Sequence, residues 1–326
     1  MSPFQILLCI LVLLLAVAVV YAIFHSKGLI KANPFMDKNL LKRGLDKPAI
    51  WLYYDTSDVN SRTWGDFGAR SSRVLNLPFL NLCYQTIVHQ NKDTYRVEVI
   101  GGLAGAAELL GGWDQLPPGL RDPVSPVNEA EHDYLRAAIL AKYGGLWLDP
   151  HSICLKPFGP LPKEKTVFFG TDLDETYAGE AGTTVPGLRA VWTPKPNHPM
   201  FKEWTAVCYQ RVAEKRGGQQ IRGDAKWDFV RFSSDYVHTG LIVDPAAEGM
   251  RKKNGKRIEL EDILASNTDG NVPFDLCSYT TYITIPGKEL RDRTVFGWFL
   301  RMSEEQIMES DLAVKHLLKK ALNAHP

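Results

Sequence analysis

The sequence predicts an α/β domain in which a mainly parallel sheet is flanked by helices, preceded by an apolar N-terminal segment. Short apolar runs that are typical of strands alternate along residues 47–326 with longer segments of helical periodicity, and this order is typical of α/β folds. The stretch 128–158 contains the most informative series, which is a helix, a glycine stop, a buried strand and a polar turn.

Size and composition limit the classes of protein that this chain can belong to. The chain has 326 residues, 45% of them hydrophobic, which is enough for one large domain or two small ones. It has 38 basic and 37 acidic residues, and this balance argues against a nucleic-acid binder driven by bulk charge. The five cysteines are far apart, without a C-x-x-C pair, so neither a zinc knuckle nor a dense disulfide framework is expected.

Residues 4–24 contain no charged side chain and are rich in Leu, Val, Ile and Ala. Roughly 20 such residues span the hydrocarbon core of a bilayer, so we expect a single-pass membrane anchor. A cleaved signal peptide is the alternative, but no Lys or Arg precedes the apolar run, whereas a signal peptide begins with positive charge.

Basic residues follow the apolar run at Lys27, Lys31, Lys38, Lys42 and Arg43. The positive-inside rule therefore favours a cytoplasmic catalytic domain, and a Golgi-lumen domain is the alternative. We divide the chain into an anchor at residues 1–24, a linker at 25–46 and one domain at 47–326.

The domain begins with an apolar strand at residues 49–54, which ends at Asp55. A helix at 78–91 and an alternating strand at 95–100 follow. The glycines at 101–105 lack the G-x-G-x-x-G order of a dinucleotide site, so they indicate a loop or the start of a helix.

The central helix is expected to begin at Asn128, whose side chain can form a capping box with Glu131. It ends at Gly144 and Gly145, because glycine adopts a left-handed cap at little cost. The apolar run at 146–148 suits a strand that is buried on both faces.

That strand leads directly into Asp149, Pro150 and His151. Ligands of open α/β sheets bind at the carboxyl ends of strands, so these residues are candidates for a binding site. In an extended turn, residues two apart project to the same side. We therefore expect Asp149 and His151 to face one cleft beside the end of the first strand, close enough to share one ion.

The remainder of the domain continues the alternation of strands and helices. Further strands are expected at 166–170, 188–193 and 282–285, and amphipathic helices at 197–215 and 303–324. Residues 172–175 form an acidic cluster, for which a solvated turn is the alternative to a site that faces sugar or metal.

Two motifs in the central stretch carry a resemblance to a known family. Asp133 and Arg136 form a D-x-x-R pattern on the helix, and residues 143–149 read Y-G-G-L-W-L-D. At this spacing the chain resembles the capsular polysaccharide synthesis proteins and related glycosyltransferases with a DXD sugar-binding region. The resemblance covers the middle of the chain well and its ends poorly.

The resemblance implies a GT-A type fold and an enzyme, hexosyltransferase-like, that transfers sugar from a nucleotide-sugar donor to a glycan or polysaccharide acceptor. It also implies a divalent metal, Mn²⁺ or Mg²⁺, with Asp149 and His151 as ligands and His238 as a third ligand from a late loop. His151 stands where the family usually has a second carboxylate, and a hydrogen bond from His151 to a phosphate oxygen is the alternative to a metal bond. For His238, a packing or surface histidine is the alternative.

The resemblance also assigns roles to other residues of this region. Asp133 and Arg136 would face the donor's sugar as catalytic residues together with Asp149; an ion pair within the helix is the alternative. Tyr53 and Asp55 would meet the nucleotide at the end of the first strand, where an ordinary strand-ending turn is the alternative.

The resemblance further makes Gly144 and Gly145 candidate donor-binding residues. The sequence does not single out a catalytic base, for which Asp172, Asp174, Glu175 and Asp235 are candidates.

Two other functions stay open. The chain can be a catalytically silent relative that binds glycans or serves as a membrane-tethered scaffold. It can also be a hydrolase or phosphotransferase that uses Asp149, the acidic cluster and a metal ion.

Overall fold

The structure is a computed structural model that describes residues 47–55, 77–121, 127–171, 186–214, 241–244, 247–250, 252, 256–267, 272 and 274–323. The chain divides into two units, Met1–Asp46 and Lys47–Pro326, and every described residue lies in the second. The expected anchor at 4–24, the linker, the acidic cluster at 172–175, Asp235 and His238 lie outside the described residues. Within the described part of the chain, none of the helices has the length and apolar character to cross a bilayer.

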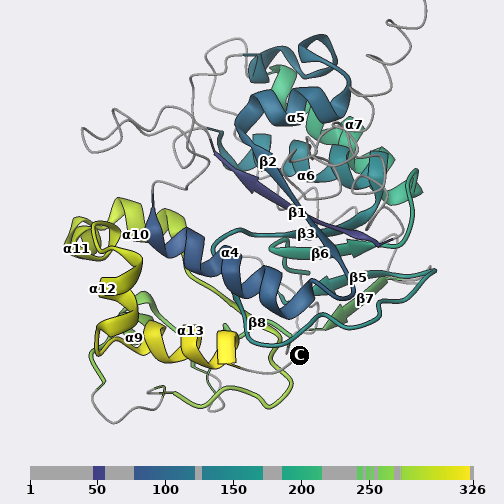
Figure 1. The fold of residues 1–326 in the computed structure, drawn as a ribbon. Coiled ribbons are helices and arrows are strands. Elements are labelled where there is room, and N and C mark those ends of the chain that lie inside the picture. The colour runs from purple at the N-terminus through teal and green to yellow at the C-terminus, as the bar shows by residue number, and fades with distance from the viewer. Residues whose placement is uncertain are drawn as a thin grey trace, which may run out of the picture. The chain divides into compact units, whose positions relative to one another are not determined.

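A six-stranded sheet forms the centre of the described unit, in the order β2-β1-β3-β6-β5-β7 (Figure 1). Its strands are β1 (Ala49–Tyr54), β2 (Arg96–Gly101), β3 (Gly145–Leu148), β5 (Thr166–Phe169), β6 (Ala190–Thr193) and β7 (Leu241–Asp244). β6 runs antiparallel to its neighbours β3 and β5, while the other pairs are parallel. The prediction of a mixed α/β fold with a mainly parallel sheet is therefore confirmed.

Helices cover both faces of this sheet. Side chains alternate between the two faces of a strand, and the even-numbered residues of β1 join one apolar cluster while the odd-numbered residues join another. The first cluster includes side chains of α4 (Pro78–Asn91) and α13 (Ala313–Asn323). The second includes side chains of α5 (Gly102–Leu110), α6 (Glu129–Tyr143) and α7 (Pro199–Glu214). β1 is buried along its whole length because both faces are covered.

The helix α6 has the start and end that its sequence predicts. The Asn128 side chain accepts a hydrogen bond from the Glu131 amide at 3.1 Å, and the Glu131 carboxylate accepts one from the Asn128 amide at 2.9 Å. Such a cap stabilises a helix by about 1 kcal/mol. The helix ends at Gly144, whose φ is 67°, and the chain enters β3 directly.

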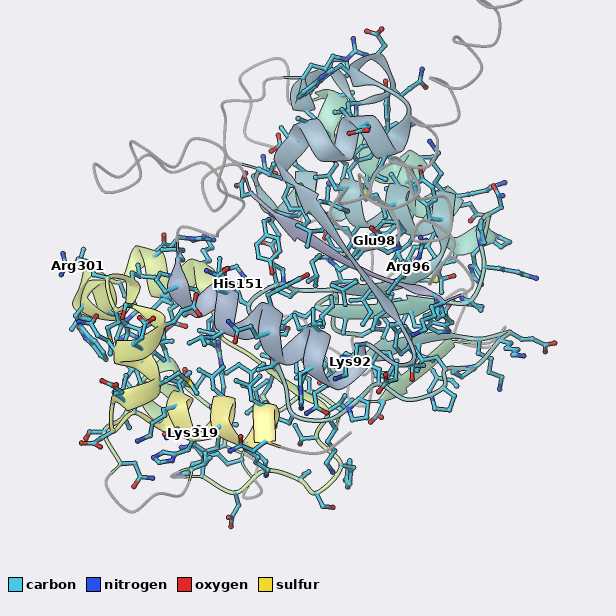
Figure 2. The ribbon with its side chains drawn as sticks, viewed as in Figure 1. Lys92, Arg96, Glu98, His151, Arg301 and Lys319 are labelled. Atoms are coloured by element: carbon cyan, nitrogen blue, oxygen red, sulfur yellow. The ribbon has the colours of Figure 1, made fainter. Side chains whose placement is uncertain are left out.

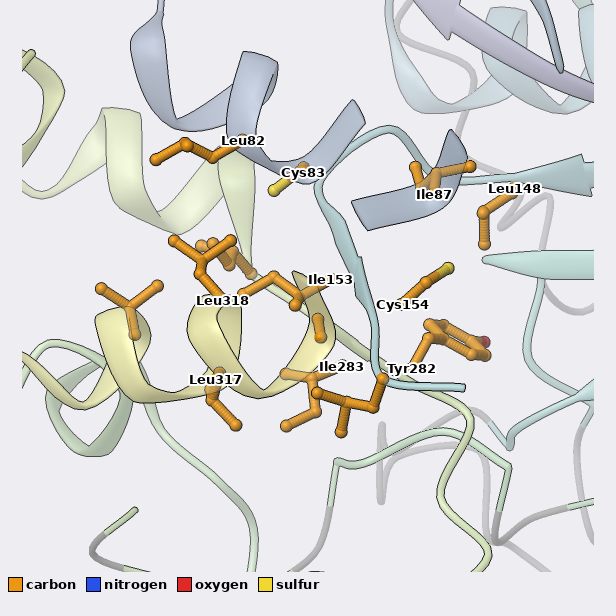
Figure 3. Close-up of a cluster of buried hydrophobic side chains, with 14 of the residues drawn as sticks. Leu82, Cys83, Ile87, Leu148, Ile153, Cys154, Tyr282, Ile283, Leu317 and Leu318 are labelled. Carbon is orange, nitrogen blue, oxygen red and sulfur yellow. The ribbon is translucent and has the colours of Figure 1, made fainter. Parts of the chain in front are cut away.

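A second, two-stranded sheet follows the central stretch. β4 (Ser152–Cys154) pairs antiparallel with β8 (Tyr282–Thr284). Figure 3 shows Ile153 and Ile283 of this sheet in the same apolar cluster as Leu82 of α4 and Leu318 of α13. The small sheet therefore fixes the turn after β3 to the C-terminal part of the chain.

The helix expected at 303–324 is interrupted, so that part of the prediction is wrong. α12 (Glu304–Glu309) begins with a capping box at Ser303, and α13 begins only at Ala313. Between them, Leu312 forms an antiparallel bridge with Ser266, and the Ala313 amide donates to the Ala265 carbonyl at 2.9 Å. The Ala313 amide therefore cannot donate to the carbonyl four residues earlier, as a continuous helix would require.

Several short helices complete the described unit. They are η2 (Trp113–Gln115), η3 (Pro118–Leu120), α9 (Leu260–Ile263), α10 (Gly287–Asp292), η7 (Thr294–Phe296) and α11 (Gly297–Leu300). Of these, α10 matters for the site, because its first residue packs against His151.

Candidate functional site

Asp149 lies at the carboxyl end of β3, beside the ends of two neighbouring strands. β1 is parallel to β3, so its carboxyl end lies at the same edge of the sheet. β6 is antiparallel, so its start lies there instead, and the Asp149 amide donates to the Arg189 carbonyl at 2.7 Å. The Asp149 side chain is 33% exposed, which leaves it accessible to a ligand.

His151 binds Asp149 directly. Its backbone amide and its ring Nδ1 both lie 2.9 Å from Oδ1 of Asp149. The ring packs 5.9 Å, centroid to centroid, from Phe79 at the start of α4, and the His151 carbonyl accepts from the Ile285 amide at 2.9 Å. Figure 2 shows His151 on the side where α4 begins and α10 lies. His151 therefore holds the carboxylate in one orientation.

The other ring nitrogen of His151 is enclosed by the fold. Nε2 is buried and has no hydrogen-bond partner among the described residues. A Cβ placed on Gly287 would lie 2.3 Å from this nitrogen, so only a glycine leaves room for the ring. The imidazole thus packs against both Phe79 and the backbone of α10.

The electrostatic surroundings keep Asp149 ionised. Burial by itself would raise the pKa of the carboxyl group. The hydrogen bonds and charge of His151, together with the positive charge of Arg189, outweigh burial and hold the pKa below its ordinary range. Asp149 is therefore a carboxylate at neutral pH and can bind a cation.

His132 of α6 is a site residue that the sequence analysis missed. Its ring meets Tyr53 edge to face, with centroids 5.0 Å apart. Burial lowers the pKa of His132 to about 4, and the charges of Arg136, Asp149, His151 and Arg291 also act on it. The ring is therefore neutral at pH 7. It stands one residue before Asp133, but no spacing rule distinguishes it from a surface histidine.

Asp133 and Arg136 form the ion pair that the sequence left as the alternative. Their closest atoms are 2.6 Å apart, and their side chains are only 5% and 12% exposed. The Arg136 guanidinium also lies over the ring of Trp147 on β3, 5.7 Å from its centroid. The pair braces α6 against the strand that leads to Asp149; a contact with the donor's sugar stays a prediction.

Tyr53 and Asp55 lie at the carboxyl end of β1, as predicted. The Tyr53 ring is buried and stacks on Trp147 with centroids 6.5 Å apart. The Asp55 carboxylate accepts a hydrogen bond from the Val127 amide at 3.3 Å, which ties the end of β1 to the start of α6. Their contact with a nucleotide stays a prediction.

Gly144 and Gly145 lie at the amino end of β3, and the structure does not bring them together with Asp149. Four strand residues separate the two ends by about 13 Å. A Cβ on Gly145, whose φ is 99°, would lie 2.6 Å from the Ala49 carbonyl oxygen. These glycines allow β3 to pack closely beside β1, which explains the residue type without a bound donor.

Arg189 is a second residue that the sequence analysis missed, because it was read only as part of a strand. It directly precedes β6 and forms an ion pair with the buried Glu248, whose Oε1 lies 3.4 Å from Nε of Arg189. Only the sheet topology brings Arg189 beside Asp149.

The expected metal ligands fit a metal site only in part. No three His, Cys, Asp or Glu side chains gather to hold a metal ion in the described ranges, and His238 lies outside them. Asp149 fits the part of a metal ligand, because it is ionised and partly exposed. His151 does not fit in its present orientation, since Nδ1 faces Asp149 and Nε2 is enclosed. The two side chains contact each other instead of converging on a shared ion.

Comparisons with known proteins add little. No protein-family model matches the chain, and no curated protein sequence matches it significantly. A solved structure described as "PaToxG Glycosyltransferase" is similar over 86% of this chain and 90% of that chain, with 12% sequence identity and a TM-score of 0.36. At that TM-score, the likeness adds nothing to what the chain's own residues support.

Proposed function

We propose that the protein is a glycosyltransferase with a GT-A type domain that uses a nucleotide-sugar donor. The observation that carries the proposal is the place of Asp149 in the sheet. β1 lies between β2 and β3, and the connections from β1 to β2 and from β2 to β3 use helices of opposite faces. The chain therefore changes direction between β1 and β3, and open α/β sheets bind their ligands at such a switch point.

The residues at this switch point suit a charged donor. Asp149 would hold the divalent ion, Mn²⁺ or Mg²⁺, and His151 would orient the carboxylate through its two hydrogen bonds. The ion would neutralise charge on the diphosphate of the donor. Asp133 and Arg136 would face the sugar, and Tyr53 with Asp55 the nucleotide, as the resemblance to DXD-containing transferases implies.

For the acceptor and the location of the enzyme, our proposal rests on the sequence. We infer a glycan or polysaccharide acceptor of the kind that capsular polysaccharide synthesis proteins extend. The apolar residues 4–24 would anchor the enzyme in a membrane. Carbonate extraction of the full-length protein tests the anchor, because a spanning helix resists extraction.

Donor binding is tested by thermal stabilisation with a panel of sugar nucleotides, each with and without Mn²⁺. A ligand at 100 times its Kd stabilises the folded state by about 2.7 kcal/mol. We expect one nucleotide class to raise the Tm, and more strongly with Mn²⁺. If none of the sugar nucleotides raises the Tm, with or without Mn²⁺, the proposal is contradicted.

The role of Asp149 is tested by Asp149→Ala, with Asp93→Ala at an exposed turn as the matched control. We expect Asp149→Ala to lower the rate of Mn²⁺-dependent transfer by at least about a hundredfold, because the side chain that holds the ion is lost. The control should keep parental activity. Unchanged turnover in a folded Asp149→Ala protein would remove the metal mechanism and favour a catalytically silent, glycan-binding relative.

A further inference from the structure

Arg189 occupies a position from which its side chain can reach a ligand of Asp149. It directly precedes β6, and its carbonyl accepts the Asp149 amide hydrogen bond at 2.7 Å. The register that pairs Leu148 with Ala190 brings Arg189 opposite Asp149 at the carboxyl edge of β3.

A buried carboxylate fixes the guanidinium at this edge. Nε of Arg189 lies 3.4 Å from Oε1 of Glu248, whose side chain is only 1% exposed. The Thr284 hydroxyl donates to the same oxygen at 3.0 Å. A Cβ on Gly170 would lie 2.4 Å from the other carboxylate oxygen, so Glu248 depends on a glycine for its space. Arg189 is thus held by an ion pair with a buried carboxylate that is itself fixed by a hydrogen bond and by close packing.

The same guanidinium can also bind an anion. The Arg189 side chain is 29% exposed, and a guanidinium has five N–H donors in a planar fork that suits phosphate oxygens. Such a group can be shared between a carboxylate and a phosphate oxygen. Arg189 therefore places a positive charge beside Asp149, where the negative charge of a diphosphate would need a cation in addition to any metal ion.

We propose that Arg189 binds the diphosphate of the sugar donor and stabilises it as the leaving group. Transfer breaks the bond between sugar C1 and a phosphate oxygen, which keeps the electron pair. The acceptor hydroxyl oxygen forms the new bond to C1 and releases its proton to solvent. Arg189 meets the charge that develops on the departing phosphate oxygen. This inference rests on the proposed glycosyltransferase function and adds to it the group that receives the leaving diphosphate.

A purely structural role predicts the same ion pair, so the experiment must separate stability from binding. Arg189→Gln alone removes the positive charge beside the buried Glu248 carboxylate, and we expect this variant to be destabilised. Arg189→Gln with Glu248→Gln replaces the ion pair by two neutral amides and should restore stability. The matched control is Arg96→Gln with Glu98→Gln, which removes a 3.2 Å ion pair on β2; Figure 2 labels that pair.

The binding of UDP, GDP and inorganic pyrophosphate is then measured by calorimetry for the parent protein and both double variants. We expect the Arg189/Glu248 double variant to match the parent in urea unfolding but to bind these probes about 10 to 100 times more weakly, as for a lost charged hydrogen bond. The Arg96/Glu98 variant should bind as the parent does.

Each other result has a defined meaning. A folded Arg189/Glu248 double variant with parental affinity would overturn this inference and leave the glycosyltransferase proposal standing. A parent protein that binds none of the probes would overturn both.

Chemical protection provides a readout that requires no variant. Phenylglyoxal modifies exposed arginines, and pyrophosphate should slow modification of Arg189 in the parent protein several-fold while leaving Arg96 unaffected. Equal rates at Arg189 with and without pyrophosphate, measured by peptide mass spectrometry, would contradict the proposal even if the double variant does not fold.

Discussion

Gly287→Ala is expected to disturb the Asp149 site from a position that carries no functional group. The added Cβ would lie 2.3 Å from Cδ2 and from Nε2 of the His151 ring, whereas ordinary contacts are 3.4–4 Å. The ring must therefore move by about 1 Å or more. The ring also packs against Phe79, so a shift of the ring disturbs that contact as well.

The expected cost follows from the contacts that are lost. Overpacking of a closed space costs about 1–3 kcal/mol, and the hydrogen bond between the ring and the Asp149 carboxylate contributes about 1.5–3 kcal/mol at most. Replacing glycine by alanine in a helix returns up to about 1 kcal/mol. We expect a net loss of about 1.5–5 kcal/mol, which corresponds to a Tm lowered by roughly 3–9 °C in a domain that spans residues 47–326.

Urea and thermal unfolding followed by circular dichroism measure this loss. Gly297→Ala is the matched control, because among the described residues its Cβ at the start of α11 would meet only the Arg301 side chain, at 3.9 Å. His151→Ala combined with Gly287→Ala should be less destabilised than the sum of the single variants, since the clash disappears with the ring. If Gly287→Ala and Gly297→Ala have the same free energy of unfolding, the inferred close packing of the His151 ring against Gly287 is refuted.

Two further predictions concern α6. His132 has a pKa of 6.5 when unfolded and about 4 when folded, so its contribution is fully present above pH 6.5 and is lost as the pH falls through about 4. The loss amounts to roughly 3 kcal/mol. In His132→Gln, the free energy of unfolding should therefore fall less between pH 7 and pH 4.5 than in the parent protein. The same pH dependence in both proteins would contradict this. Asn128→Ala removes the hydrogen bond to the Glu131 amide and should cost about 1 kcal/mol in urea unfolding; parental stability would mean that the cap is dispensable.

Local patterns in the sequence predicted the elements that depend on local interactions. The strand at 49–54 and the helix at 78–91 have the bounds expected from apolar periodicity and from Pro78. The capping box at Asn128 is present because both of its partners lie within one turn of helix. Likewise, the strand after Gly144 and the turn at Asp149 follow from a glycine stop and a short apolar run.

Interactions between distant parts of the chain were not predictable in the same way. Nothing in residues 188–193 indicates that β6 runs antiparallel, so Arg189 could not be assigned to the edge where Asp149 lies. The contact between Gly287 and His151 and the pairing of β4 with β8 depend on packing of the C-terminal part. The break between α12 and α13 arises from a bridge to Ser266, which no helical periodicity reveals.

The contact between His151 and Gly287 also has a consequence for the order in which the protein folds during synthesis. All six strands of the central sheet are translated before α10 and α13, but α13 belongs to the apolar cluster on one face of that sheet, and a domain generally folds as one unit. Until the C-terminal part has left the ribosome, the sheet therefore lacks its cover on that face, and His151 lacks the backbone beside its ring. On a ribosome stalled before residue 287 we expect neither a fully packed sheet nor an Asp149 carboxylate held in one orientation.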